Sequence, residues 1–501
     1  MLNDERGRTL TFRQYRSAAE EVAAGLAALG VHAGTVVSWQ LPTSIEAMVL
    51  LAALARLGAV QNPIIPVLRD REVRFITRQA GAELFVVPGV FRNVDYGAMA
   101  ERIAGEIGFA VHVTGLAGDP ASAHGSFGLS LPAGDPTTLP PPPVGDRGLT
   151  TWIYYTSGTT ADPKGARHSD LSVMATSNGA CEVGGFGPDD VSIAASPTTH
   201  IGGVMLLTVG LRSGCRHAVV DTWDPVRTPL FASRQGITVL RGAGPMLGVY
   251  IEAQRTHGEE PLFPDLRYCL SGGAPLPPGT SEDARDVLGG LGALSSWGLT
   301  EFAVATCPPP DRPEMVHVGV GPVVPHVSLR VVGPDGRDCG IGEEGELCAK
   351  GPQLMLGYVD PSLDVDAFDE HGYFRTGDLG LIDEQGYVHV TGRLKEIIIR
   401  NGENISARQV ELALLEHPGI ADCAVIGLPD DHTGERCVAV IAPTDDRADS
   451  PLTLAEVAAH CRAEGLAVFK TPEQLEIVDE IPRNDLGKAQ KPALKARFTA
   501  P

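Results

Sequence analysis

The chain has 501 residues, which is more than one compact core usually holds, so we expect at least two domains. A hydrophobic content of 43% and a charged content of 20% are typical of globular proteins. The formal net charge of −22 argues against nucleic acids and anionic membrane surfaces as partners, because both carry negative charge themselves. A nucleotide substrate therefore has to be met by positive charge concentrated locally.

Targeting and redox signals are few. The nine cysteines are scattered and form no CxxC pair, which indicates neither a disulfide framework nor a zinc site, and a reduced cytoplasm is the expected location. No charged-then-apolar leader follows Met1. The most apolar runs, 47–60 and 201–211, are too short to span a bilayer, so no membrane span is expected and both should be buried core helices.

The first hundred residues alternate between helix and strand signals. Thr11 with Gln14 three residues later forms a capping box, and apolar residues then recur at helical spacing up to Gly30. Further along we expect a strand at 36–41, a helix at 44–58, a helix from Asp70 and an apolar strand at 84–87. This alternation predicts a doubly wound α/β sheet with helices on both faces.

Residues 115–148 are rich in Gly, Ala, Ser and Pro and include four consecutive prolines. Such a composition favours no regular element, and a run of prolines is stiff. We therefore interpret this segment as a semi-rigid linker.

The stretch 154–167, YYTSGTTADPKGAR, continues an apolar run that we expect to end a strand. Its glycines let backbone N–H groups turn inward to hold an anion, its hydroxyls add donors, and its lysine adds a point charge. It is not a Walker A loop, in which Ser or Thr follows the lysine, because Lys164 is followed by Gly165 and Ala166. The pattern predicts a phosphate-binding loop, with a plain surface loop as the rarer alternative. The residues expected to contact phosphate are Thr156, Ser157, Gly158, Thr159, Thr160 and Lys164.

The rest of the chain divides into a β-rich part and a compact end. Strands are expected at 191–195 and 237–240, and short strands at 327–332 and 345–348 predict a small β-rich subdomain. A new unit begins near Arg393, with helices expected at 406–416 and 454–464 and strands at 397–399, 423–426, 437–442 and 474–478. We therefore expect a large N-terminal domain over 1–392 and a small, mobile α/β domain over 393–501.

Stretches along nearly the whole chain resemble, in order, the motifs of the adenylate-forming superfamily, which includes acyl- and aryl-CoA synthetases, the adenylation domains of nonribosomal peptide synthetases, and firefly luciferase. Besides 154–167 they are SPTTHIGG (196–203), SGGAPL (271–276), SWGLTE (296–301), FRTGDLG (374–380), TGRLKE (391–396), RNGEN (400–404) and PRNDLGK (482–488). The chain departs from the family in three places. Ala161 stands where glycine is usual, Trp297 stands where tyrosine is commoner, and relatives usually carry an extra strand-bearing segment ahead of the capping box.

The resemblance implies a site for ATP and Mg²⁺. In the family an aromatic residue at the place of Trp297 packs on the adenine, the residue at Thr300 reaches the α-phosphate, and the residue at Glu301 holds Mg²⁺, which Thr156 is expected to join as a ligand. Asp378 is expected to accept hydrogen bonds from the ribose hydroxyls, because a carboxylate accepts from two neighbouring donors at once. The other nucleotide-binding residues implied are Gly272, Gly273, Ala274, Ser296, Gly298 and Arg393.

The resemblance also implies catalytic and acceptor residues. Lys488 is expected to bridge the acyl carboxylate and the phosphate, and Lys395 to be the hinge about which the small domain rotates. Asn401 and Gly402 are expected to face the thiol of coenzyme A, with a hairpin turn as the alternative. His200 is expected to gate the acyl pocket, although an isolated histidine of this kind is more often a packed core residue. The acyl pocket is expected to comprise His200, Gly202, Gly203, Gly242, Ala274 and Val304.

The segments expected to line the acyl pocket are small or apolar and supply no fixed charge. The amino-terminal part of the chain looks closest to the branch of medium-chain fatty acid and cyclohexanecarboxylate CoA ligases. We expect ATP to activate a medium-chain aliphatic, alicyclic or aryl acid as an acyl adenylate, which then passes to coenzyme A with release of AMP and pyrophosphate. An amino acid is not expected, because no aspartate stands in 196–203 to pair with its ammonium.

Two alternatives stay open: a stand-alone adenylating enzyme that loads a carrier protein, and a nucleotide-binding protein that has lost catalysis. Neither HExxH nor GxSxG occurs in the chain, which argues against a metalloprotease and against an α/β-hydrolase. The sequence leaves the oligomeric state open, a homodimer included.

Overall fold

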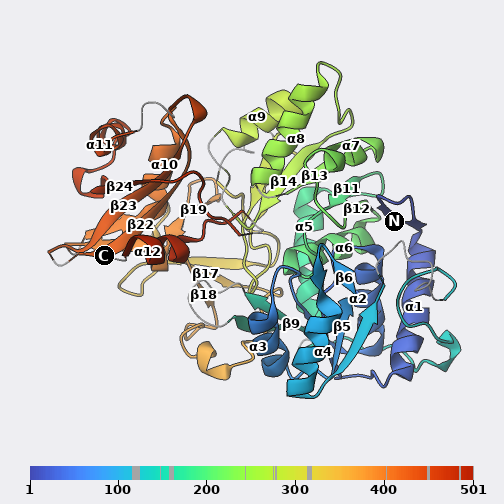
Figure 1. The fold of residues 1–501 in the computed structure, drawn as a ribbon. Helices are drawn as coiled ribbons and strands as arrows, with labels where there is room; N and C mark the ends of the chain where they lie inside the picture. The colour runs from blue at the N-terminus through green and yellow to red at the C-terminus, as the bar shows by residue number, and fades with distance from the viewer. Residues whose placement is uncertain are drawn as a thin grey trace.

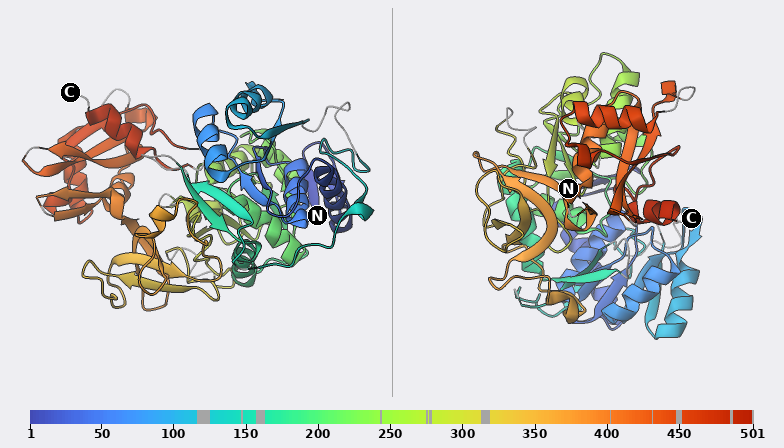
Figure 2. Two further views of the ribbon diagram at one scale, coloured as in Figure 1. Left: turned by 90° about the horizontal axis from the view of Figure 1, so that it is seen from below. Right: turned by 90° about the vertical axis from the view of Figure 1, so that its left-hand side faces the viewer.

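A computed structural model describes residues 1–115, 125–146, 148–156, 163–242, 244–274, 276, 279–312, 319–401, 403–430, 432–447, 452–484 and 487–499. Two large, mostly parallel sheets with their helices form the N-terminal part, as Figure 1 shows. A small antiparallel sheet follows, and a C-terminal α/β unit stands to one side of the rest (Figure 2).

The first large sheet is six-stranded and is covered on its outer face by α3 (Asp70–Ala80) and α4 (Tyr96–Ile107). Neighbouring strands of this sheet are parallel, except that β9 and β10 at one edge are antiparallel. Its order is β10 (Lys164–His168), β9 (Trp152–Thr156), β4 (Val60–Pro63), β3 (Val36–Trp39), β5 (Leu84–Pro88) and β8 (Ala110–Thr114). A short hairpin, β6 (Val90–Phe91) with β7 (Val94–Asp95), leads into α4.

The second large sheet is seven-stranded and carries α7 (Arg227–Arg234), α8 (Gly244–His257) and α9 (Thr280–Leu288) on its outer face. Its order is β15 (Ala293–Ser296), β14 (Tyr268–Gly272), β13 (Val239–Arg241), β11 (Val191–Ala194), β12 (Arg216–Val219), β1 (Leu2–Asp4) and β2 (Thr9–Leu10). The strands β1 and β2 precede the capping box, so a strand-bearing segment is present there after all.

A layer of helices separates the two sheets: α1 (Phe12–Ala28), α2 (Ile45–Leu57), α5 (Asp170–Gly184) and α6 (Ile201–Ser213). The expectation that 47–60 and 201–211 are buried core helices is confirmed by α2 and α6, which contribute to one apolar core with both sheets. Ser44 caps α2 at its start, and Gly58 ends it with a φ of +71°, a conformation that glycine adopts without strain. The predicted capping box of α1 is also present.

The segment 115–148, interpreted from its composition as a semi-rigid linker, lies within the N-terminal part of the chain. It connects β8 to β9 within one sheet, and its described part packs on α1 and α2. Arg56 donates to the carbonyl of Pro140 at 2.7 Å, and Gly134 donates to the carbonyl of Glu21 at 3.0 Å. Composition correctly indicated the lack of long regular elements, but it carries no information on which elements the segment connects.

The antiparallel sheet consists of β16 (Ser328–Val332), β17 (Gly345–Lys350), β18 (Phe374–Ile382) and β19 (Val388–Arg393). The C-terminal unit has the sheet β21 (Glu403–Ser406), β20 (Ile397–Arg400), β23 (Gly434–Pro443), β22 (Ile420–Asp430) and β24 (Gln474–Ile477), with helices α10 (Ala407–Leu415), α11 (Leu454–Ala463) and α12 (Lys491–Thr499). The α/β fold class is confirmed. The helix α12 was not predicted, and the domain boundary at Arg393 stays a prediction.

All nine cysteines are free thiols. Among the described residues, no helix combines the length and the apolar character that a membrane crossing needs.

A buried ion cluster fixes the N-terminal strands to α2. Glu46 is fully buried in the first turn of α2, and Arg8 binds both of its oxygens, at 2.6 and 3.1 Å. Arg8 Nε also lies 2.8 Å from Asp4 Oδ2. Since Asp4 belongs to β1, this cluster joins the edge of the seven-stranded sheet to the central helix layer.

We predict that Arg8→Met lowers the free energy of unfolding by about 3–5 kcal/mol, because it leaves the Glu46 carboxylate buried without its partner. The double variant Arg8→Met with Glu46→Leu removes both charges and should recover most of that loss. Chemical denaturation of the two variants and the parent measures the difference. Equal losses in the single and the double variant would contradict the role given to this pair.

Candidate active site

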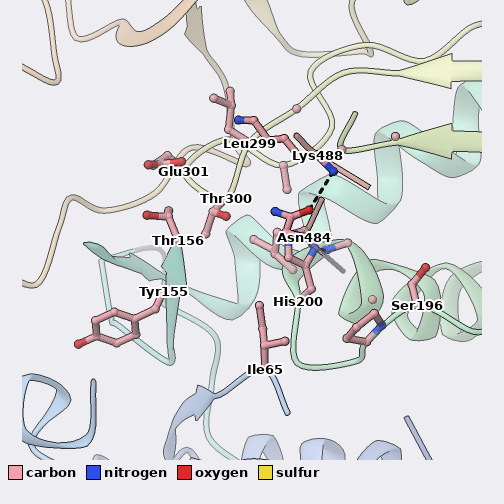
Figure 3. A pocket seen from close by; sticks show the side chains of 18 of the residues that line it. Ile65, Tyr155, Thr156, Ser196, His200, Leu299, Thr300, Glu301, Asn484 and Lys488 are labelled. Atoms are coloured by element: carbon pink, nitrogen blue, oxygen red, sulfur yellow. Dashed lines mark hydrogen bonds between the residues drawn. The ribbon is translucent and has the colours of Figure 1, made fainter. Parts of the chain in front are cut away.

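A cavity of about 1550 Å³ lies where the parallel strands of both sheets end and the C-terminal unit meets them. Its size exceeds the roughly 300–1,000 Å³ of a typical small-molecule site, so it has room for more than one ligand. Figure 3 shows side chains from both parts of the chain facing this space, among them Thr156, Thr300 and Glu301 on one side and Lys488 on the other. The ends of parallel strands are the usual binding edge of such sheets.

The loop after β15 is held in a strained form. Val304 has a φ of +52°, which a β-branched residue rarely adopts. Gly298 makes this possible, because a Cβ there would lie 2.3 Å from the backbone nitrogen of Val304. The carbonyl of Val304 accepts from Gln353 at 3.1 Å, and Ala305 donates to the carbonyl of Trp297 at 2.8 Å. The surrounding contacts thus stabilise a conformation that the residue itself disfavours.

Asp378 is nearly fully buried, and two groups contact its carboxylate. The indole nitrogen of Trp297 donates to Oδ2 at 2.8 Å, and Arg393 Nε lies 2.7 Å from Oδ1. Asp378 lies directly opposite Arg393 in the β18–β19 ladder. The loop after β15, the antiparallel sheet and the strand that leads into the C-terminal unit therefore meet at one carboxylate.

His168 positions the motif at 296–301 and was missed by sequence reasoning. It is fully buried in β10, and its Nε2 lies 2.9 Å from the carbonyl oxygen of Thr300. A carbonyl only accepts, so Nε2 carries the proton, and Nδ1 faces Ser172 Oγ at 3.1 Å. Burial lowers the pKa of His168 to about 4, which keeps this ring neutral at neutral pH. A lone histidine after the loop that is expected to bind phosphate carries no sequence signal for this contact.

Glu301, Tyr358 and Lys164 form a connected polar wall. The Tyr358 hydroxyl donates to Glu301 Oε1 at 2.7 Å, and the ammonium of Lys164 lies 5.3 Å from the centre of the Tyr358 ring. No hydrogen bond from a described residue reaches Glu301 Oε2. Among the described residues there is no cluster of three His, Cys, Asp or Glu side chains that could hold a metal alone. A single free carboxylate oxygen near Thr156 fits Mg²⁺, which commonly takes one or two protein oxygens and completes its shell with phosphate and water.

Lys488 reaches the cavity from the C-terminal unit. Its backbone nitrogen donates to Asn484 Oδ1 at 2.9 Å, and no described side chain pairs with its ammonium. Burial lowers the pKa of Lys488, and Arg393 adds to this effect while Glu396 and Asp378 oppose it. The side chain is therefore a partly buried cation with no fixed counter-ion in contact, which favours an anionic ligand beside it.

His200 caps the start of α6 and lines the cavity. The backbone nitrogen of Gly202 donates to His200 Nδ1 at 3.1 Å, so in the neutral ring Nε2 carries the proton. Burial lowers the pKa of His200 to about 4, so the ring is neutral at neutral pH. His200 thus offers the cavity a neutral donor rather than a cation.

The structure brings most of the predicted residues to this cavity. Those that line it are Thr156, Lys164, His200, Gly202, Gly203, Gly242, Gly272, Gly273, Ser296, Trp297, Gly298, Thr300, Glu301, Val304, Arg393, Lys395 and Lys488. Ala274 and Asp378 do not reach its wall, and Asn401, which directly follows β20, does not line it either. Ser157, Gly158, Thr159, Thr160 and Gly402 lie outside the described residues.

One charged residue that the sequence did not predict also lines the cavity. Arg241 directly precedes Gly242, which was expected to line the acyl pocket. The surrounding stretch is otherwise small or apolar, so a charge at its edge had no pattern that could have indicated it.

Comparison with known proteins places the chain among enzymes. A family model described as AMP-binding enzyme matches residues 1–359, and one described as AMP-binding enzyme C-terminal domain matches residues 409–488. The chain is 32% identical to the sulfoacetate–CoA ligase of Cupriavidus necator, over 98% of this chain and 93% of that protein. It is 30% identical to the medium-chain fatty-acid–CoA ligase of Escherichia coli, over 97% of this chain and 86% of that protein.

Among solved structures, the ATP-bound crystal structure of MatB from Rhodopseudomonas palustris matches with a TM-score of 0.86 and 29% identity. The match covers 99% of this chain and 95% of that chain. Both parts of the chain thus have counterparts in one known protein.

We predict that Trp297→Phe keeps the aromatic packing but removes the donor to Asp378, leaving a buried carboxylate oxygen unpaired. If Asp378 binds ribose, the KM for ATP should rise roughly tenfold, the size expected for one hydrogen bond to a charged group. Steady-state kinetics with ATP and with 2′-deoxy-ATP measure this. The penalty should shrink for the deoxynucleotide. An unchanged KM for ATP would show that the hydrogen bond from the Trp297 indole to Asp378 does not contribute to ATP binding.

Proposed function

The chain belongs to the AMP-binding enzyme family and is an AMP-forming acid–thiol ligase, and we propose that it activates a carboxylic acid with ATP as an acyl adenylate and then transfers the acyl group to coenzyme A. The observation that carries this proposal is the position of Lys488. Its ammonium faces Thr300 and Glu301 across one cavity and has no partner among the described side chains (Figure 3).

The first step has to overcome charge repulsion. A carboxylate is a poor acceptor for a thiol, because its leaving group would be oxide, so the acid is first joined to the α-phosphate of ATP and pyrophosphate leaves. The attacking carboxylate and the phosphate are both negative, and Lys488 and Lys164, which both line the cavity, would offset that repulsion. Mg²⁺, held by Glu301 with Thr156, would add a further charge on the phosphate side.

The second step needs Lys488 removed and a thiol admitted. In the structure Lys395 is exposed in the short turn between β19 and β20, with only two other residues, Leu394 and Glu396. We propose that the C-terminal domain, 393–501, rotates about Lys395. Asn401, which does not line the cavity in this structure, would then face it together with Gly402 and border the path of coenzyme A.

The acid that we propose is a medium-chain aliphatic, alicyclic or aryl acid. Support comes from the apolar walls of the cavity near His200, which include Met205, Leu270 and Val304. The named substrates of the two relatives, sulfoacetate and medium-chain fatty acids, differ in size and charge, so they support the reaction type more than the acid. Free thiols at all nine cysteines suit the reduced cytoplasm that we propose as the location.

The test is pyrophosphate release from ATP with a panel of acids, with and without coenzyme A. We expect release with apolar acids, faster turnover when coenzyme A is present, and a sharp drop for every α-amino analogue, because no carboxylate in the gate segment pairs with an ammonium. Release that coenzyme A does not stimulate would favour the carrier-protein alternative. No release with any acid would favour the protein that has lost catalysis.

We predict that Lys488→Ala abolishes adenylate formation but spares thioester formation from a supplied acyl adenylate, because the cation acts only in the first step. Single-turnover measurements of each half-reaction separate the two. Lys470→Ala, a lysine of the same domain outside the cavity, serves as the control and should change neither rate. Equal losses in both half-reactions would remove Lys488 from the role proposed for it.

A further inference from the structure

One arginine, Arg241, stands in the cavity wall directly before Gly242, which is expected to line the acyl pocket. Arg241 is the last residue of β13, and its side chain leaves the strand on the same face as Val239, because side chains alternate along a strand. That face packs in an apolar cluster with Met205, Leu270 and Leu294. A guanidinium therefore stands beside a cluster of buried apolar side chains.

This guanidinium has no counter-ion among the described residues. Its Nη1 is buried and makes no hydrogen bond, and no described carboxylate lies within ion-pair distance of it. Other partly buried arginines of the chain are paired: Arg8 with Glu46 at 2.6 Å, and Arg267 with Asp190 at 2.7 Å. Arg241 is the exception among these.

The titratable groups around Arg241 do not neutralise its charge. Burial raises the pKa of the Cys215 and Cys307 thiols to about 12, and the Tyr268 hydroxyl donates to the carbonyl of Gly184 at 2.7 Å. All three are uncharged at neutral pH. Burial lowers the pKa of Arg241 itself only to about 10, so the guanidinium remains a cation. An unpaired cation beside buried apolar side chains destabilises the free protein unless a ligand pairs with it.

We propose that Arg241 binds a second oxyanion, carried at the far end of the acid substrate. This deepens the proposed function and rests on it: the reacting carboxylate lies near Lys488 and Thr300, and a carboxylate or sulfonate at the other end of the molecule pairs with Arg241. The apolar residues between the two ends, such as Met205 and Val304, contact the carbon chain. The planar guanidinium can hold either oxyanion with two parallel hydrogen bonds.

The experiment compares acids that differ only at the far end: glutarate with pentanoate, adipate with hexanoate, and 4-sulfobutanoate with pentanoate. Pyrophosphate release gives kcat/KM for each with the parent, with Arg241→Met and with Arg227→Met. The last is a control, since Arg227 is exposed at the start of α7 and pairs with Asp224 outside the cavity. Arg241→Met keeps the length of the side chain and removes the charge.

At its best chain length the parent should prefer the dianion by at least about tenfold, and Arg241→Met should reverse the preference, whereas Arg227→Met should leave it unchanged. The melting temperature of Arg241→Met without ligand should equal or exceed that of the parent, because a buried charge is lost. Arg241→Gln provides a second uncharged variant. A preference of the parent for the monoacid at every length, or an unchanged ratio in both Arg241 variants, would overturn this inference and leave the proposed function standing. No pyrophosphate release with any acid would overturn both.

Discussion

The carboxylate of Asp378 is the point on which the arrangement of the site depends. It accepts from the indole of Trp297 and lies against Arg393, which is also its cross-strand neighbour. Through these contacts the loop after the seven-stranded sheet and the last two strands of the antiparallel sheet share one buried charge. A buried charge that loses its partner is destabilising, so displacing either Trp297 or Arg393 should destabilise this junction.

Local signals in the sequence were enough to predict much of the fold. The capping box at Thr11, the paired caps Ser44 and Gly58 and the apolar strand at 84–87 all form as expected, because each depends on neighbouring residues alone. The order of the motifs predicted residues of which most line the cavity. Other features depend on distant partners: the segment 115–148 joins two strands of one sheet, and composition cannot show which elements a segment connects.

Contacts between residues far apart in the sequence also explain which parts of the candidate site could not be predicted. Trp297 was expected only to pack on a base, but the structure adds a hydrogen bond to a residue 81 positions away. His168 supports the carbonyl of Thr300 across 132 positions. Arg241 was missed because an isolated arginine in an apolar segment has no sequence pattern, and only the missing partner in three dimensions makes it informative.

The ion pairs of Lys491 have a consequence for the order of events in the reaction. Lys491 contacts Glu396 at 2.6 Å and Glu411 at 2.8 Å, so the residue directly after Lys395 is tied to the start of α12 and to α10. Lys488 lies three residues before Lys491 and has to move with this block. The rotation proposed about Lys395 would carry Lys488 with it, so opening the site to a thiol and withdrawing the cation would be one motion. The sequence of the two half-reactions would then be set by mechanical coupling within the domain, without a separate signal.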